Sequence, residues 1–184
     1  MEMKSIQLRP GDVAIAMELA ISADRGLTGL ASAVFRSLGE VHNAMGRLRA
    51  AHLLKPMGRE VAIGPLTNFI RWGVPHAFPA VVGGLTTGIA TARLDSAGQQ
   101  MDPSVSGATV EFVWPDSSGP SRGQALEPLY PNARKLVAAN RELYSLLSLT
   151  DLIRIGGARE ANAAITAISR RLTQGSRPAD EVGP

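Results

Sequence analysis

Side chains suited to hydrogen bonding with DNA base edges are concentrated in one stretch of this 184-residue sequence, from position 36 to position 59. Asn43 carries the amide that binds the edge of adenine, and Arg47 could bind a guanine or a phosphate. Further candidate DNA-binding residues in this stretch are Ser37, Gly39, His42, Arg36, Lys55 and Arg59. The other interpretation is that these residues only form a solvated polar surface.

Patterns that indicate catalysis or metal binding are not found. The three histidines, His42, His52 and His76, lack the i, i+4 spacing of a helical metal site. There is no cysteine to act as a metal ligand or a nucleophile. The aspartates stand mostly where helix starts and turns are expected, which are ordinary structural positions. We therefore expect no enzyme activity, no cofactor and no metal ion.

A helix of about fourteen residues is expected to position the polar side chains. Ser37 is typical of a helix N-cap, and Glu40 three residues later completes a capping box. Apolar residues then recur at three- and four-residue steps, which predicts a buried stripe of Leu38, Val41, Met45 and Leu48. The opposite face is small and polar, so a DNA groove could come close to the helix; it holds Gly39, Asn43, Gly46, Arg47 and Ala50.

Two helices are expected before this one. The first covers residues 8–22, and the second is short and runs from Thr28, its expected cap, to Val34. Three helices with a short turn before the third have the layout of a helix-turn-helix. The stretch resembles the helix-turn-helix core of MarR-like winged-helix transcriptional regulators over about residues 8–75. The matching residues are Ala31, Ser37, Val41, Met45 and Leu48.

The sequence departs from the family pattern at two glycine positions. Phe35 stands where the family has its turn glycine, and His52 stands where the family has the glycine that ends the helix. Histidine tolerates a left-handed backbone better than bulky β-branched residues do. The resemblance implies that the third helix enters the major groove of double-stranded DNA and that a β-hairpin wing follows it.

The wing is expected from two short arms, Leu53–Pro56 and Glu60–Ile63, with Met57, Gly58 and Arg59 at its tip. Lys55 and Arg59 could contact phosphates from this wing, and Arg25 or Arg36 could do so from the helices. The alternative is that the segment is a plain loop.

The rest of the chain completes a fold that is mainly α with a small β component. Residues 1–75 are expected to form the winged helix-turn-helix domain, which ends in a short helix over 66–72. An irregular connector with short strands at 88–92 and 110–114 follows over 76–125. A C-terminal helical region covers 126–173, and a disordered tail covers 174–184.

Three C-terminal helices are expected, over residues 131–139, 141–155 and 158–172, with Asn140 capping the second. The last helix carries an apolar stripe, which is usually part of a core and could equally be a dimer seam. Its residues are Ala161, Ile165, Ile168 and Leu172.

Composition indicates a globular protein, because 45% of the residues are hydrophobic. No apolar run approaches the roughly 18 residues of a membrane span, and no signal peptide is recognised, so we expect a cytoplasmic protein. The net charge of +3 is uneven: residues 1–80 and 131–184 each carry +3, and residues 81–130 carry −3. The positive charge of these two outer regions agrees with nucleic-acid binding. Ordinary charged side chains on a solvated surface account for this small excess of positive charge equally well.

These observations predict a transcriptional regulator that binds double-stranded DNA as a homodimer. Its C-terminal region would form the dimer or respond to a signal such as a small-molecule effector. The alternative is a protein-interaction module, such as an antitoxin or an adaptor, whose winged helix binds a partner protein.

Overall fold

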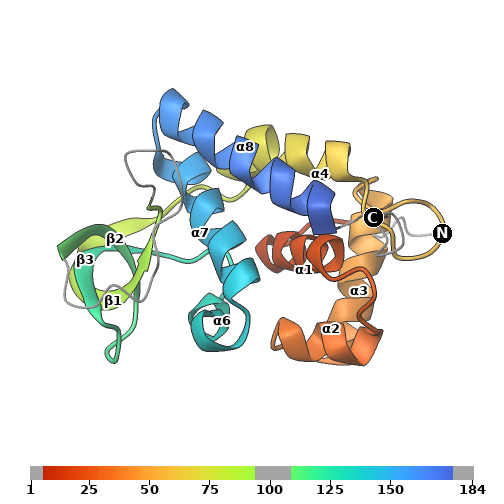
Figure 1. The fold of residues 1–184 in the computed structure, drawn as a ribbon, viewed down its shortest axis with the longest axis horizontal. Coiled ribbons are helices and arrows are strands. Elements are labelled where there is room, and N and C mark those ends of the chain that lie inside the picture. The colour runs from red at the N-terminus through yellow and green to blue at the C-terminus, as the bar shows by residue number, and fades with distance from the viewer. Residues whose placement is uncertain (1–5, 94–108, 176–184) are drawn as a thin grey trace, which may run out of the picture. The chain divides into compact units, whose positions relative to one another are not determined.

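The computed structural model describes residues 6–93 and 109–175, and its described part is mainly helical with a small sheet (Figure 1). This confirms the expected class. The chain divides into two compact units. The first unit comprises Met1–Thr67 and Ser169–Pro184, and the second comprises Asn68–Ile168.

Three helices form most of the first unit: α1 (Pro10–Ile21), α2 (Leu27–Ala33) and α3 (Leu38–Ala50). Pro10 lies at the first helical position of α1, where a missing N–H costs nothing. The expected cap of α2 is wrong. Gly26, with φ −63° and ψ 164°, is its N-cap, and Thr28 lies within the first turn. The extended backbone that an N-cap requires is therefore found two residues earlier than expected.

The start of α3 confirms the predicted capping box. The Glu40 N–H donates to Ser37 Oγ at 3.2 Å, and the Ser37 N–H donates to Glu40 Oε2 at 3.0 Å. Val41, Met45 and Leu48 are buried as expected, together with Ala44. Leu38 was expected in the same stripe but is 50% exposed. Helical side chains lean toward the N-terminus, so the first residue projects past the end of the helix.

The segment after α3 forms a minimal hairpin. Leu54 and Val61 form an antiparallel β-bridge. On either side of it, the Lys55 N–H donates to the Glu60 carbonyl at 2.8 Å and the Ala62 N–H donates to the Leu53 carbonyl at 3.0 Å. The two expected arms therefore pair with each other, although over a shorter length than a regular hairpin.

The short helix expected over 66–72 is longer in the structure. Helical backbone runs from Ile63 through α4 (Ile63–Asn68), a π-helical turn η1 (Phe69–Gly73) and α5 (Val74–Ala77). Pro75 was expected to end the helix. It instead falls in the first turn of α5, where proline is tolerated because its N–H is not needed.

The expected irregular connector contains a closed three-stranded sheet. Its strands are β1 (Val82–Thr91), β2 (Thr109–Pro115) and β3 (Ser121–Leu126). β1 pairs antiparallel with both other strands, and β2 pairs in parallel with β3, so each strand has two neighbours (Figure 1). The connector is thus more regular than predicted, and its residues 94–108 lie outside the described part.

Helices α6 (Ala133–Ala139), α7 (Arg141–Ile155) and α8 (Ala158–Gly175) follow. The predicted cap of α7 is confirmed, because the Asn140 side-chain oxygen accepts the Leu143 N–H at 3.2 Å. Gln174 and Gly175, expected in the disordered tail, belong to α8. Residues 176–184 of that tail lie outside the described part. No helix within 6–93 and 109–175 is long and apolar enough to cross a membrane.

The apolar stripe of α8 is buried in the single chain. Ile165 is 5% exposed, and Ile168 and Leu172 are fully buried. Ala161, the first residue of the stripe, is half-buried. The burial of the other three agrees with the interpretation of the stripe as core.

Candidate functional site

The outer face of α3 is small and polar, as predicted from its periodicity. Gly39, His42, Asn43 and Gly46 are all exposed, and so is the capping residue Ser37. The opposite face is held in the first unit by buried Val41, Ala44, Met45 and Leu48. The four exposed residues of the outer face could therefore contact a ligand without any change in the core.

Arg47 differs from its prediction. Its Nε and Nη2 donate to the two carboxylate oxygens of Asp12, both at 2.7 Å, and its side chain is only 18% exposed. These hydrogen bonds raise the pKa of Arg47 and, with the charge of Asp12, outweigh the effect of burial. Asp12 is buried near the start of α1, where it also accepts the Arg9 N–H at 2.9 Å. Arg47 thus links α3 to α1 and is not free to bind a guanine.

Arg36 is also paired with a carboxylate. Its Nη1 donates to Glu40 Oε1 at 2.8 Å, four residues further along the chain. The backbone and side-chain hydrogen bonds of Ser37, together with Arg36, lower the pKa of Glu40. Exposed pairs of this kind contribute little energy and exchange partners readily. Arg36 therefore lies at the N-terminal end of α3, as predicted, but its charge is balanced there.

The cations predicted to contact phosphates from the hairpin and from Arg25 differ in whether a carboxylate balances their charge. Lys55 forms an ion pair with Glu60, the residue that faces it across the hairpin. Arg59 donates to the backbone carbonyl of Arg25 at 2.8 Å, and Arg25 itself lies 3.5 Å from the buried carboxylate of Glu18. Of these three cations, only Arg59 has no carboxylate partner in the described part of the chain.

Arg49 was not among the predicted site residues. Its Nη2 donates to the Gly58 carbonyl at 2.9 Å, which joins the last turn of α3 to the tip of the hairpin. Among the described residues no carboxylate pairs with it, so Arg49 and Arg59 leave two uncompensated charges beside the hairpin. The only signal in the sequence was a basic residue in the last turn of the predicted helix.

The turn before α3 and the end of α3 have left-handed backbone. Phe35 has φ 50° and His52 has φ 57°. These are the two positions where the family pattern described above has glycine. Phe35 is also 36% exposed, and with Leu38 it forms an apolar patch at the N-terminal end of α3 that the sequence did not indicate.

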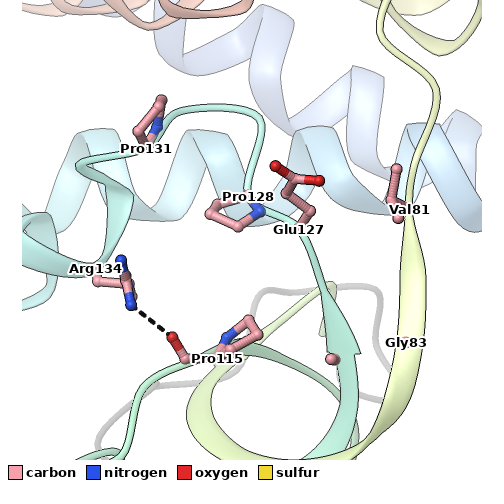
Figure 2. A pocket seen from close by; sticks show the side chains of 8 residues that line it. Val81, Gly83, Pro115, Glu127, Pro128, Pro131 and Arg134 are labelled. Carbon is pink, nitrogen blue, oxygen red and sulfur yellow. Dashed lines mark hydrogen bonds between the residues drawn. The ribbon is translucent and has the colours of Figure 1, made fainter.

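The second unit contains a pocket of about 380 Å³ between the start of β1, the end of β3 and the segment that leads to α6 (Figure 2). Its walls are mainly apolar and include Pro115, Pro128 and Pro131. Two charged side chains, Glu127 and Arg134, also line it. None of these residues was among the predicted site residues.

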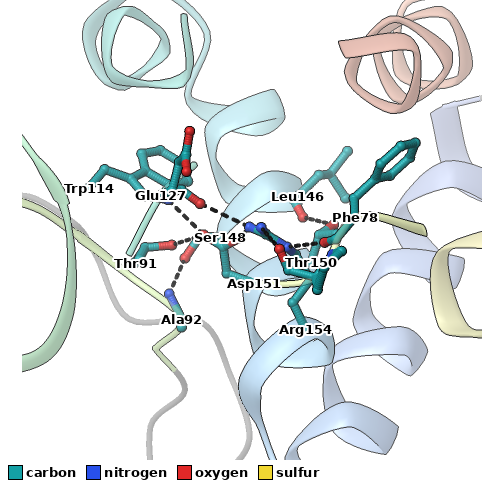
Figure 3. A network of polar contacts seen from close by, with 11 residues as sticks. Phe78, Thr91, Ala92, Trp114, Glu127, Leu146, Ser148, Thr150, Asp151 and Arg154 are labelled. Carbon is teal, nitrogen blue, oxygen red and sulfur yellow. Dashed lines mark hydrogen bonds and ion pairs between the residues drawn. The ribbon is translucent and has the colours of Figure 1, made fainter. Parts of the chain in front are cut away.

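A buried polar network lies near the pocket (Figure 3). Asp151, which is fully buried, accepts hydrogen bonds from Thr91 Oγ1 at 2.7 Å, Trp114 Nε1 at 2.6 Å and Arg154 Nη1 at 2.8 Å. Burial raises the pKa of Asp151, and the charge of Arg154 with these hydrogen bonds opposes that rise. The network joins β1 and β2 to α7.

Comparison of the chain with protein-family profiles, curated proteins and solved structures gives no match. Within the described residues, no group of three or more histidine, aspartate or glutamate side chains could hold a metal ion. The function is therefore argued from the geometry of the chain itself.

Proposed function

We propose that the first unit binds double-stranded DNA and regulates transcription, with α3 in the major groove. The observation that carries this proposal is the exposed face of Gly39, His42, Asn43 and Gly46 on a helix whose other face is buried. The two glycines let the DNA approach the helix axis, and Asn43 supplies an amide for an adenine edge. The capping box fixes the first turn, where such helices meet the bases.

Contacts to the phosphate backbone come from the hairpin side of this surface. Arg49 and Arg59 donate only to backbone carbonyls, so their positive charges remain available to phosphates. Phosphate contacts set the position and the salt dependence of binding, whereas base contacts set the sequence. The left-handed backbone at Phe35 and His52 further supports the helix-turn-helix geometry on which the proposal depends.

The proposal is tested by selecting bound sequences from a random DNA pool and measuring affinity by fluorescence anisotropy. Asn43→Ala is expected to cost about 1–3 kcal/mol on the selected site, the usual value of one bidentate base contact. Its binding to unrelated DNA stays unchanged. Asn68→Ala, which changes another exposed asparagine at the end of α4, is the matched control and leaves both affinities as they were.

Salt dependence gives the second readout. Arg59→Ala is expected to weaken binding to all sequences alike and to lower the slope of log affinity against log salt by about one. If no sequence is enriched from the pool and binding to DNA does not depend on salt, the proposal is wrong.

A second candidate function is binding of a partner protein through the same end of α3. The exposed Phe35 and Leu38 favour it, because aromatic and aliphatic side chains at the centre of a patch are typical of protein interfaces. The ion pairs of Arg36 and Lys55 also reduce the positive charge that DNA would meet. Loss of partner binding in Leu38→Ser with DNA affinity unchanged would assign the patch to a protein.

A further inference from the structure

The pocket of the second unit has walls that are fixed before any ligand binds. Three of its residues are prolines, whose backbone has little freedom to lose (Figure 2). The Glu127 N–H donates to the Val81 carbonyl at 3.0 Å. This hydrogen bond joins the segment just before β1 to the segment just after β3, and both segments line the pocket. Binding to such a preorganised site costs little ordering entropy.

A buried guanidinium holds the same segments from behind. Arg154 donates to the backbone carbonyls of Phe78, Pro79 and Glu127, each at 3.1 Å (Figure 3). Asp151 balances its charge at 2.8 Å. The backbone on both sides of the pocket is therefore anchored to α7, and the position of Glu127 does not depend on a ligand.

The two charged residues of the pocket are not equivalent. Arg134 donates to the Pro115 carbonyl at 2.8 Å and also interacts with the charge of Asp116. Glu127 is exposed, and no cation pairs with its carboxylate among the described residues. Because Asp116 offsets the charge of Arg134, the charge of the pocket lining that is left without a partner is the Glu127 carboxylate.

We propose that this pocket binds a small organic cation, an ammonium group on an apolar body, with the ammonium on Glu127 and the body against the prolines. A volume of about 380 Å³ lies within the range of sites for small ligands, and apolar walls with one or two directed polar groups are typical of them. An anion would be repelled by Glu127. A neutral ligand of the same shape could donate at most an uncharged hydrogen bond and would leave the charge of the carboxylate uncompensated.

The test uses three probes of similar size: phenethylammonium, its neutral isostere 2-phenylethanol and the anion phenylacetate. Each is titrated into the full-length protein, and the backbone amide signals are followed by two-dimensional NMR. We expect saturable shifts at Val81, Ala125 and Glu127 with phenethylammonium. Its dissociation constant should be lower than that of 2-phenylethanol by about tenfold or more, as expected for one charge-assisted hydrogen bond.

Two variants locate the binding. Glu127→Gln should remove the preference for the ammonium over the alcohol, whereas Glu111→Gln, an exposed carboxylate on β2 outside the pocket, should leave it unchanged. Ala125→Leu should fill the pocket and weaken all three probes, with the dispersion of the amide signals showing that the variant is folded.

Four results would overturn the proposal. The first is equal binding of phenethylammonium and 2-phenylethanol, and the second is a preference that survives Glu127→Gln. The third is the absence of saturable shifts in the pocket with any probe. Tightest binding of phenylacetate would also contradict it, because the anchor would then be Arg134. None of these measurements depends on DNA binding by the first unit.

Discussion

Arg47 lies on the polar side of α3 by sequence position, yet its side chain belongs to the interior of the first unit. Its guanidinium matches the Asp12 carboxylate through two parallel hydrogen bonds of 2.7 Å. This geometry is the one in which an arginine and a carboxylate bind most strongly. The pair keeps the buried carboxylate compensated and fixes the position of α3 against α1.

Removal of this guanidinium should destabilise the protein. Arg47→Met leaves Asp12 buried without a counter-charge, so we expect the free energy of unfolding to fall by about 3 kcal/mol. Urea denaturation followed by circular dichroism measures it. The double variant Asp12→Asn with Arg47→Met should recover part of the loss. An unchanged midpoint for the single variant would show that the pair is unimportant to the fold.

The residues of the outer face of α3 could be predicted because helical periodicity alone assigns faces. Gly39, His42, Asn43 and Gly46 are exposed for this reason. The role of Arg47 could not be predicted, because its partner lies 35 residues away and no local pattern connects them. The pocket was missed for the same reason, since Pro115 and Glu127 come together only when the sheet closes.

Among the elements, the helices with local signals were predicted well. The expected strand at 110–114 lies within β2 and the one at 88–92 covers only the end of β1, while β3 was not predicted. Ser37 and Asn140 cap α3 and α7 through contacts three residues away, and the sequence displays such signals directly. Six of the ten residues of β1 are glycine or threonine, and its pairing partners are remote. Pairing within the closed sheet outweighs the weak local preference of this strand.

The capping box should make the stability of the fold depend on pH in acid. Hydrogen bonds from Ser37 lower the pKa of Glu40 from its ordinary value of 4.5, so the ionised form is favoured by folding. The contribution to stability is therefore present above about pH 4.5 and is lost as the pH falls through the lower folded pKa. Glu40→Gln, which does not titrate, should be less stable than the parent at pH 7 and should approach it as the pH falls below the lowered folded pKa of Glu40. Melting curves across this range measure the difference, and a constant difference would contradict the assignment.

Gly88 lies at a position of the closed sheet that has no room for a side chain. A Cβ added there would overlap the Trp114 backbone carbonyl of the paired strand, and only glycine permits this approach. Gly88→Ala should therefore lower the free energy of unfolding by about 2–3 kcal/mol. Gly84→Ala, on the same strand with no atom near the added Cβ, should stay within about 0.5 kcal/mol of the parent. Thermal melts compare the two, and equal effects would contradict the register of β1 and β2.

For the whole molecule, α8 contributes residues to both units, because one division between them falls at Ile168 and Ser169. The other division falls at the last residue of α4, between Thr67 and Asn68. Its stripe is buried in the single chain, so a homodimer, which the resemblance implies, would need another surface. The stripe is thus expected to contribute to stability and not to assembly.

Ile168→Ala tests this expectation. Truncation of a fully buried isoleucine should lower the free energy of unfolding by about 2–5 kcal/mol. Light scattering should give the same molar mass for the parent and the variant. Arg170→Ala, an exposed change on the same helix, should alter neither quantity. A loss of mass to half with unchanged stability would instead make the stripe a dimer seam.

The guanidinium of Arg154 also determines how the second unit can open. It holds carbonyl groups from residues 75, 76 and 27 positions away, while Asp151 compensates its charge. If one of these segments detached alone, the buried Arg154 guanidinium would be left with an N–H group that has no acceptor, which costs free energy. We therefore expect the Phe78–Pro79 segment, the Glu127 segment and α7 to exchange their amide protons with solvent as one cooperative unit, with a single opening free energy in native-state hydrogen exchange.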